Sequence, residues 1–195
     1  MTSIALAEEL LLLAYDDLTG KATGSRIGLD LGMAAAVMVD LALAGRVAYV
    51  DGYLKVIDRT PTGEGIADVV LAKAANDEPH TPAQWLQRLR HRLRSRVLDD
   101  LVARGVIQDV DETHMQYIHL HRYPTVEPAV EAEIRKRLAE ALVTDGIPDE
   151  RTAALCTLLI ACRMEPALRL PPEDAERAHR RLEAIASGAG FAGEQ

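Results

Sequence analysis

Residues 31–46 of the chain, LGMAAAVMVDLALAGR, decide its fold. From position 31 to position 45, every residue except Asp40 is apolar or glycine, so a helix formed by this stretch is hydrophobic almost all round. That pattern is typical of a helix buried on all sides. We therefore expect a central helix from about Leu29 to Ala44. Gly45 stands where a left-handed residue commonly ends a helix.

The sequence on either side predicts a mainly α fold. Aromatic residues make up 4% of the chain, so leucine, alanine, valine and isoleucine must fill the core, and the first two favour helices. We expect further helices at about 4–15, 66–75, 82–104, 149–164 and 173–187, and one more that ends near 143. Two β-hairpins are expected at about 47–56 and 106–123, the first around Asp51-Gly52, a strong signal for a type I′ turn.

These elements predict a single helical domain at 1–187, built around the buried central helix. Residues 188–195 are rich in glycine and are expected to form a flexible C-terminal tail. Neither a signal peptide nor a transmembrane helix is expected, because charged residues interrupt every apolar run. Cys156 and Cys162 fall on opposite faces of one helix, so a disulfide between them is implausible. Buried thiols in a reducing compartment are therefore expected. The preference for arginine over lysine is typical of GC-rich bacterial genomes.

Four motifs, in the same order along the chain, resemble those of the Golgi phosphoprotein 3 family. They are LAEELLLLAYDDLTG (6–20), MVDLALAGRV (38–47), LVARGVI (101–107) and ALCTLLIA (154–161). The resemblance covers nearly the whole chain. It implies a mainly helical domain that binds membranes peripherally. Eukaryotic members bind phosphatidylinositol 4-phosphate through a tryptophan and three arginines, and they insert an apolar hairpin tip into the bilayer.

The resemblance also points to residues for a lipid headgroup site. The family's tryptophan position falls on Ser25, and one of its arginine positions falls on Ala34. The other two arginine positions fall on His91 and Arg94, so Arg94 is the ligand that this chain keeps. Arg26, next to Ser25, is a candidate to replace the missing basic group. The membrane-contacting tip falls at 114–118, where the apolar residues are Met115, Tyr117 and Ile118.

Residues 87–96, QRLRHRLRSR, concentrate five arginines in a chain whose net charge is −8. In an unbroken helix, Arg90 and Arg94 would flank one side of an apolar stripe and the other three arginines would flank the opposite side. The stripe would consist of Leu86, Leu89, Leu93, Val97 and Leu101. Guanidinium groups bind phosphate in a bidentate manner, so this surface favours an anionic headgroup. The alternative is a solvated face whose arginines pair with neighbouring acids.

The sequence offers no evidence for catalysis, a cofactor or a metal. It lacks the glycine-rich, nucleophile-elbow and zinc-protease motifs. The paired acids Glu8-Glu9 and Asp99-Asp100 are expected at the polar positions of amphipathic helices. His119 and His121 share a strand face, but no further metal ligand is near them in the sequence. We therefore expect a protein that is not an enzyme.

Taken together, the sequence predicts a cytoplasmic protein that lies peripherally at the inner face of the membrane. It is expected to bind anionic phospholipid headgroups of the phosphoinositide type and to act as an adaptor for a protein partner. The predicted headgroup residues are Arg94, His91, Arg90, Arg26 and Ser25. One alternative is a soluble protein–protein interaction module that has lost lipid binding. A second is a winged-helix-like DNA-binding protein, although nucleic acid is not an expected partner because the net charge of the chain repels it.

Overall fold

The computed structural model describes residues 4–15, 25–114, 118–144 and 146–188. Its helices are α1 (Leu6–Ala14), α2 (Arg26–Leu43), α3 (Gly65–Ala75), α4 (Pro82–Ala103), α5 (Pro128–Val143), α6 (Glu150–Ala161), the 3₁₀ turn η1 (Glu165–Leu168) and α7 (Pro172–Ala186). Its strands are β1 (Val47–Val50), β2 (Tyr53–Val56), β3 (Val110–His114) and β4 (Ile118–Arg122). The expected mainly helical fold with two hairpins is confirmed. Most of the expected C-terminal tail, 189–195, lies outside the described residues.

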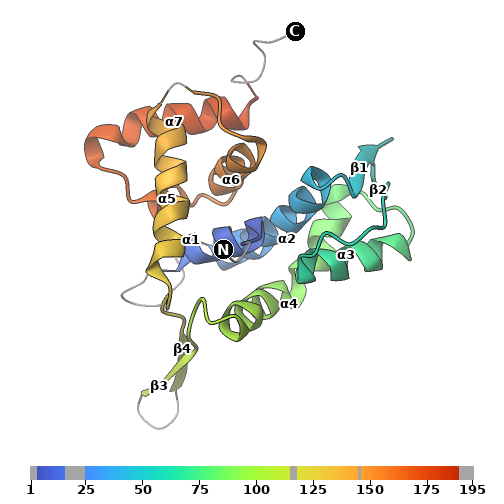
Figure 1. The fold of residues 1–195 in the computed structure, drawn as a ribbon, viewed down its shortest axis with the longest axis horizontal. Coiled ribbons are helices and arrows are strands. Elements are labelled where there is room, and N and C mark those ends of the chain that lie inside the picture. Colours follow the sequence, from blue (N-terminus) through green and yellow to red (C-terminus); the bar gives the residue numbers. More distant parts are fainter. Residues whose placement is uncertain (1–3, 16–24, 115–117, 145, 189–195) are drawn as a thin grey trace.

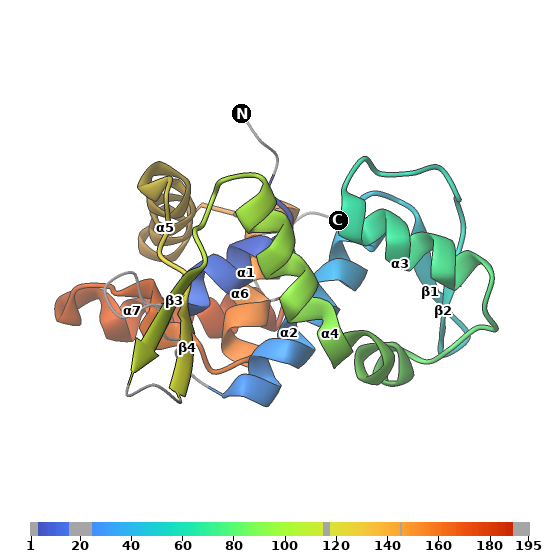
Figure 2. The same cartoon turned by 90° about the horizontal axis from the view of Figure 1, so that it is seen from below.

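Helix α2 lies at the centre of the fold, as its apolar sequence predicts. It packs against α1, α3, α4 and α6, and Met33, Ala36 and Leu41 are fully buried in these contacts. In Figure 1, α5, α6 and α7 lie on one side of α1 and α2, whereas α3 and α4 lie on the other. In the view from below, α2 runs between α4 and α6 (Figure 2). The N-terminal half of α2 therefore has helices on two sides.

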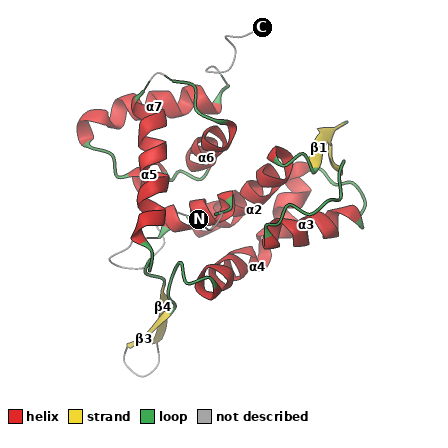
Figure 3. Ribbon diagram, in the orientation of Figure 1, coloured by secondary structure: helices red, strands yellow, loops and turns green. Residues whose placement is uncertain are grey.

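The two hairpins occupy opposite ends of the molecule (Figure 3). In the first, β1 pairs antiparallel with β2 from Val47↔Val56 to Val50↔Tyr53. Asp51 and Gly52 both have positive φ, 54° and 86°, as the expected type I′ turn requires. In the second, β3 pairs antiparallel with β4 from Val110↔Arg122 to His114↔Ile118. This hairpin projects away from the helices (Figure 1).

Helix α4 is bent in the middle, so the expectation of an unbroken helix was wrong. Thr81 caps it with Gln84 as the sequence predicts, but His91 has a ψ of 123° and Arg92 has a φ of 64°. The apolar stripe largely survives, because Leu89, Leu93, Val97 and Leu101 are all buried. The bend allows Trp85 in the first half and these residues in the second half to enter the core together. It also means that the arginines do not form two continuous rows.

Candidate functional site

The first turn of α2 carries two of the predicted headgroup residues. Ser25 is the N-cap of the helix, and its Oγ accepts a hydrogen bond from the Gly28 N–H at 3.3 Å. Arg26 begins the helix and is exposed. Ala34, where the resemblance places a family arginine, is completely buried, so this position presents no side chain to a ligand.

Arg94 comes from the second half of α4 and meets α2 at Asp30. Its Nε lies 3.2 Å from Asp30 Oδ1, and the two side chains are 16% and 20% exposed. Burial raises the pKa of the nearby Tyr15, while the charges of Arg94 and Arg26 act in the opposite direction. Tyr15 in turn contacts Tyr123 edge to face, with ring centroids 5.6 Å apart. The predicted residues Arg26 and Arg94 therefore lie around one small group of side chains.

Arg90 and His91 lie at the bend of α4. His91 is exposed, whereas Arg90 is half-buried and its Nε has no hydrogen-bond partner among the described residues. The remaining arginines of the cluster differ in their partners. Arg88 pairs with Asp77, but neither Arg92 nor Arg96 pairs with any acid in the described part of the chain, and both are exposed.

Four arginines of this region are thus free of ion pairs within the described residues: Arg26, Arg90, Arg92 and Arg96. Elsewhere on the surface, pairs such as Arg46–Asp58 and Arg180–Glu176 are formed. The alternative of a fully paired, solvated face therefore fits only Arg88 and Arg94. Sequence reasoning did not select Arg92 and Arg96, because the helical wheel of a straight helix placed them across the stripe from Arg94.

The predicted membrane-contacting tip can be placed only in part. Met115 and Tyr117 lie outside the described residues, as does the turn to which they belong. Ile118 begins β4, and the structure describes its backbone but not its side chain. Strands β3 and β4 are paired as far as His114 and Ile118, in the hairpin that projects away from the helices (Figure 1).

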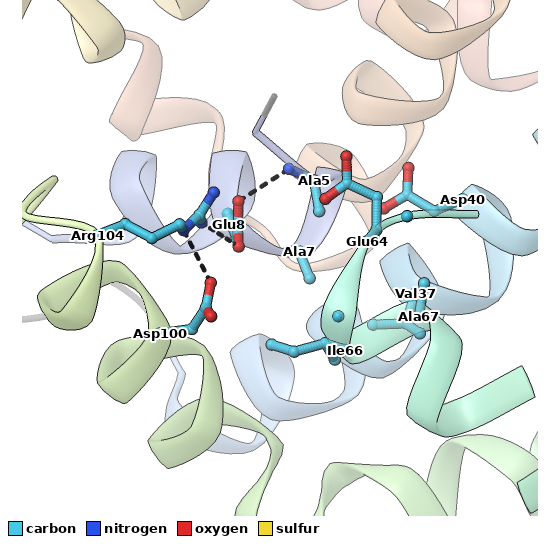
Figure 4. Close-up of a pocket in the computed structure, with 12 residues that line it drawn as sticks. Ala5, Ala7, Glu8, Val37, Asp40, Glu64, Ile66, Ala67, Asp100 and Arg104 are labelled. Atoms are coloured by element: carbon cyan, nitrogen blue, oxygen red, sulfur yellow. Dashed lines mark hydrogen bonds and ion pairs between the residues drawn. The ribbon is translucent and has the colours of Figure 1, made fainter. Parts of the chain in front are cut away.

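Glu8 and Glu9 are buried, which contradicts the expectation that they occupy solvent-facing positions. Glu8 is 3% exposed and accepts hydrogen bonds from the Ala5 N–H at 2.9 Å and from Arg104. Burial raises the pKa of the Glu8 carboxyl in spite of the neighbouring Arg104. Arg104 also pairs with Asp100 at 2.9 Å, as Figure 4 shows. The reason for the error is that the arginine partner is remote in the sequence.

Glu9 is 4% exposed and lies between two arginines from the second half of the chain. Arg137 Nη2 lies 2.5 Å and Arg151 Nη2 lies 3.2 Å from its carboxylate oxygens. Arg151 also donates to Asp40 at 3.0 Å, and Asp40 accepts the Leu6 N–H at 2.9 Å. Burial raises the pKa of the Asp40 carboxyl. This network ties α1 to α2, α5 and α6.

A small cavity of about 130 Å³ lies beside the buried acids and is lined by residues that include Glu8, Asp40, Glu64 and Arg104 (Figure 4). Glu8, Asp40 and Arg104 are already held by partners within the protein. No group of three metal-ligating side chains occurs among the residues that the structure describes. The charges of Glu8, Asp40 and Arg104 are therefore structural. The candidate binding site is the basic surface formed by Arg26, Arg90, Arg92 and Arg96 together with Arg94.

The fold and site define a helical protein with an unpaired basic surface. Within the described residues, no helix combines the length and the apolar character needed to span a bilayer. The family model for Golgi phosphoprotein 3 (GPP34) matches residues 6–195, and the chain belongs to this family. It is also similar to vacuolar protein sorting-associated protein 74 of Eremothecium gossypii, with 24% identity over 172 residues, which are 74% of this chain and 51% of that protein. The chain thus spans about half the length of the curated relative that it matches.

Proposed function

We propose that the chain is a peripheral membrane protein that binds anionic phospholipid headgroups. The observation that carries this proposal is the group of arginines without acid partners around the start of α2 and the bend of α4. In a chain with 30 acidic residues, nearby acids could have neutralised these arginines. Guanidinium groups that keep their hydrogen-bonding capacity suit phosphate, and each basic residue near an anionic leaflet contributes about 1 kcal/mol.

The predicted headgroup residues have different roles in this proposal. Arg26 and Arg90 supply free guanidinium groups, and His91 follows Arg90 at the bend of α4. Arg94 is held in place by Asp30, which also neutralises much of its charge. Ser25 acts through its cap, which fixes the start of α2 and hence the position of Arg26. The headgroup class that family membership favours is a phosphoinositide.

The projecting β3–β4 hairpin completes the proposed membrane contact. A tip at 114–118 that touches the interface would bring the neighbouring basic surface close to the headgroups. We propose that the protein works at the inner face of the membrane as an adaptor that does not catalyse a reaction. We also propose that residues 1–187 form a single domain.

Reversal of the unpaired charges tests this function. We expect Arg26→Glu and Arg96→Glu each to weaken co-sedimentation with vesicles of equal parts phosphatidylcholine and phosphatidylglycerol by at least about fivefold, because each removes a favourable charge and adds an unfavourable one. The matched control is Arg180→Glu, which makes the same change of charge at an exposed arginine of α7. Phosphatidylinositol 4-phosphate vesicles then test the headgroup. If the unmodified protein binds no lipid at all, the soluble interaction module is the better interpretation.

Removal of the acid beside Arg94 should have the opposite effect. In Asp30→Asn, Arg94 loses its ion-pair partner but keeps its place on α4, so its charge becomes available to a headgroup. We expect vesicle binding to become about fivefold tighter, since one basic charge is gained at the surface. A variant that binds anionic vesicles no better than the unmodified protein would show that Arg94 does not face the lipid.

A further inference from the structure

Arginine occupies left-handed backbone positions in this protein where glycine would be easier to accommodate. Among the described residues, the non-glycine positions with positive φ are Asp51, Arg92, Arg163 and Arg169. A left-handed conformation is unfavourable for residues with a Cβ, and asparagine or aspartate tolerates it best after glycine. Three of these four positions carry arginine, a long basic side chain that the left-handed backbone does not favour.

The end of α6 shows this most directly. The Arg163 N–H bonds to the Ile160 carbonyl at 2.9 Å and the Met164 N–H bonds to the Leu159 carbonyl at 2.8 Å, which is the Schellman pattern. The same pattern ends α2 and α4, where the left-handed residues are Gly45 and Gly105. At α6 the equivalent residue is Arg163, with φ at 55°. This side chain is exposed and has no partner within the described residues.

Arg163 lies beside the same half of α2 as the proposed lipid surface, but on its other side. The adjacent Cys162 reaches Gly28, whose carbonyl lies 3.5 Å from its Sγ. At about 100° per residue, Asp30, which pairs with Arg94, lies about 160° round the helix from Gly28. Figure 2 shows the same arrangement, with α4 and α6 on either side of α2. The segment of α4 that carries Arg92 and the end of α6 that carries Arg163 therefore lie on two sides of α2.

We propose that Arg92 and Arg163 are headgroup-binding residues, placed so that the protein contacts anionic headgroups on both sides of α2. This inference rests on the proposed lipid-binding function and extends its site to the end of α6. Because the thickness of α2 separates the two arginines, they meet neighbouring headgroups of one surface rather than a single phosphate. The ligand is thus an anionic membrane surface, and isolated phosphate is a poor substitute for it.

The test separates binding from stability. In Arg92→Asn and Arg163→Asn, the new residue tolerates the left-handed backbone, so we expect the urea midpoint of unfolding to stay equal or to rise. Vesicles of equal parts phosphatidylcholine and phosphatidylglycerol should bind each variant about fivefold more weakly, and the double variant about 25-fold more weakly. Arg163→Lys keeps the charge and should retain most of the binding.

Arg169→Asn is the matched control, because Arg169 is also left-handed but makes a polar or electrostatic contact within the protein and lies beside Thr125 and Arg135. It should bind vesicles like the unmodified protein. If the unmodified protein binds these vesicles and both single variants bind equally well, the inference is wrong and the lipid-binding function still stands. If the unmodified protein does not bind them, the function itself fails. Inorganic phosphate, at the same concentration as the lipid phosphate, should not displace the protein from the vesicles. Complete displacement would show that the ligand is a single phosphate and not a membrane surface.

Discussion

Glu9→Gln is expected to lower the free energy of unfolding by about 2–4 kcal/mol. The carboxylate is buried and receives hydrogen bonds from both Arg137 and Arg151. In the variant, the amide NH₂ group of glutamine would face the N–H groups of these two arginines, so a donor would meet donors. The positive charges of Arg137 and Arg151 would then have Asp40 as the one acid left in the network of described residues. Removal of one partner from a buried ion pair typically costs about 3–5 kcal/mol. The range is lower here because Arg137 and Arg151 are 31% and 33% exposed and water can reach them.

Urea unfolding, followed by the fluorescence of the buried Trp85, measures this change. The matched control is Glu176→Gln, which removes an equivalent carboxylate from the exposed Glu176–Arg180 pair of α7. This control should lose less than about 0.5 kcal/mol, since exposed pairs contribute little. Equal losses in the two variants would show that the Glu9 network stabilises the fold no more than a surface pair does.

Gly32→Ala should be destabilising by about 3 kcal/mol, although alanine normally favours helices. A Cβ at Gly32 would lie 2.2 Å from Cys162 Sγ and 3.0 Å from Leu10 Cδ2. Helix α2 would have to move away from the end of α6, and the side chain of Leu10 on α1 would also be crowded. Extra atoms in a well-packed core typically cost about 1–3 kcal/mol, and the short sulfur distance favours the upper end.

Gly28 provides the control for Gly32, because both belong to α2 and face Cys162. A Cβ at Gly28 would have no neighbour closer than 3.5 Å. Gly28→Ala should therefore be neutral or stabilising by about 0.5 kcal/mol, through helix propensity alone. Adding Cys162→Ala to Gly32→Ala removes the sulfur and should recover part of the lost stability, as a double-mutant cycle would show. If Gly32→Ala unfolds at the same urea midpoint as Gly28→Ala, the two helices are not in the close contact described.

The parts of the fold that sequence predicts well depend on short-range signals. The Asp51-Gly52 turn, the Thr81 capping box and the buried character of 31–46 are each written within a few residues. The bend at His91 and Arg92 has no such signal, because the segment 87–96 contains neither proline nor glycine. It reflects the packing of both halves of α4 on the core, which helical periodicity alone does not contain.

The candidate site shows the same division. Arg94 and Arg26 follow from the family resemblance and from neighbouring residues in the sequence. The pairing of Arg94 with Asp30, which changes what Arg94 offers to a ligand, depends on residues 64 positions apart (94 − 30). The positions of Arg92 and Arg163 on either side of α2 required the fold itself. The left-handed backbone of Arg163 could be recognised only once the structure showed where α6 ends.

The buried position of Glu8 and Glu9 also has a consequence for how the chain is made. Every residue of α1 is buried, yet Arg104, Arg137 and Arg151 lie 96, 128 and 142 residues further along. During synthesis α1 leaves the ribosome long before these charge partners do. Contacts of such long sequence separation form slowly, and transiently exposed apolar segments promote aggregation. Helix α1 can pack on α2 early, because α2 follows it directly, but Glu8 and Glu9 lack their full set of charge partners until Arg151 has been made. The buried charges of α1 are therefore satisfied late in the synthesis of the fold.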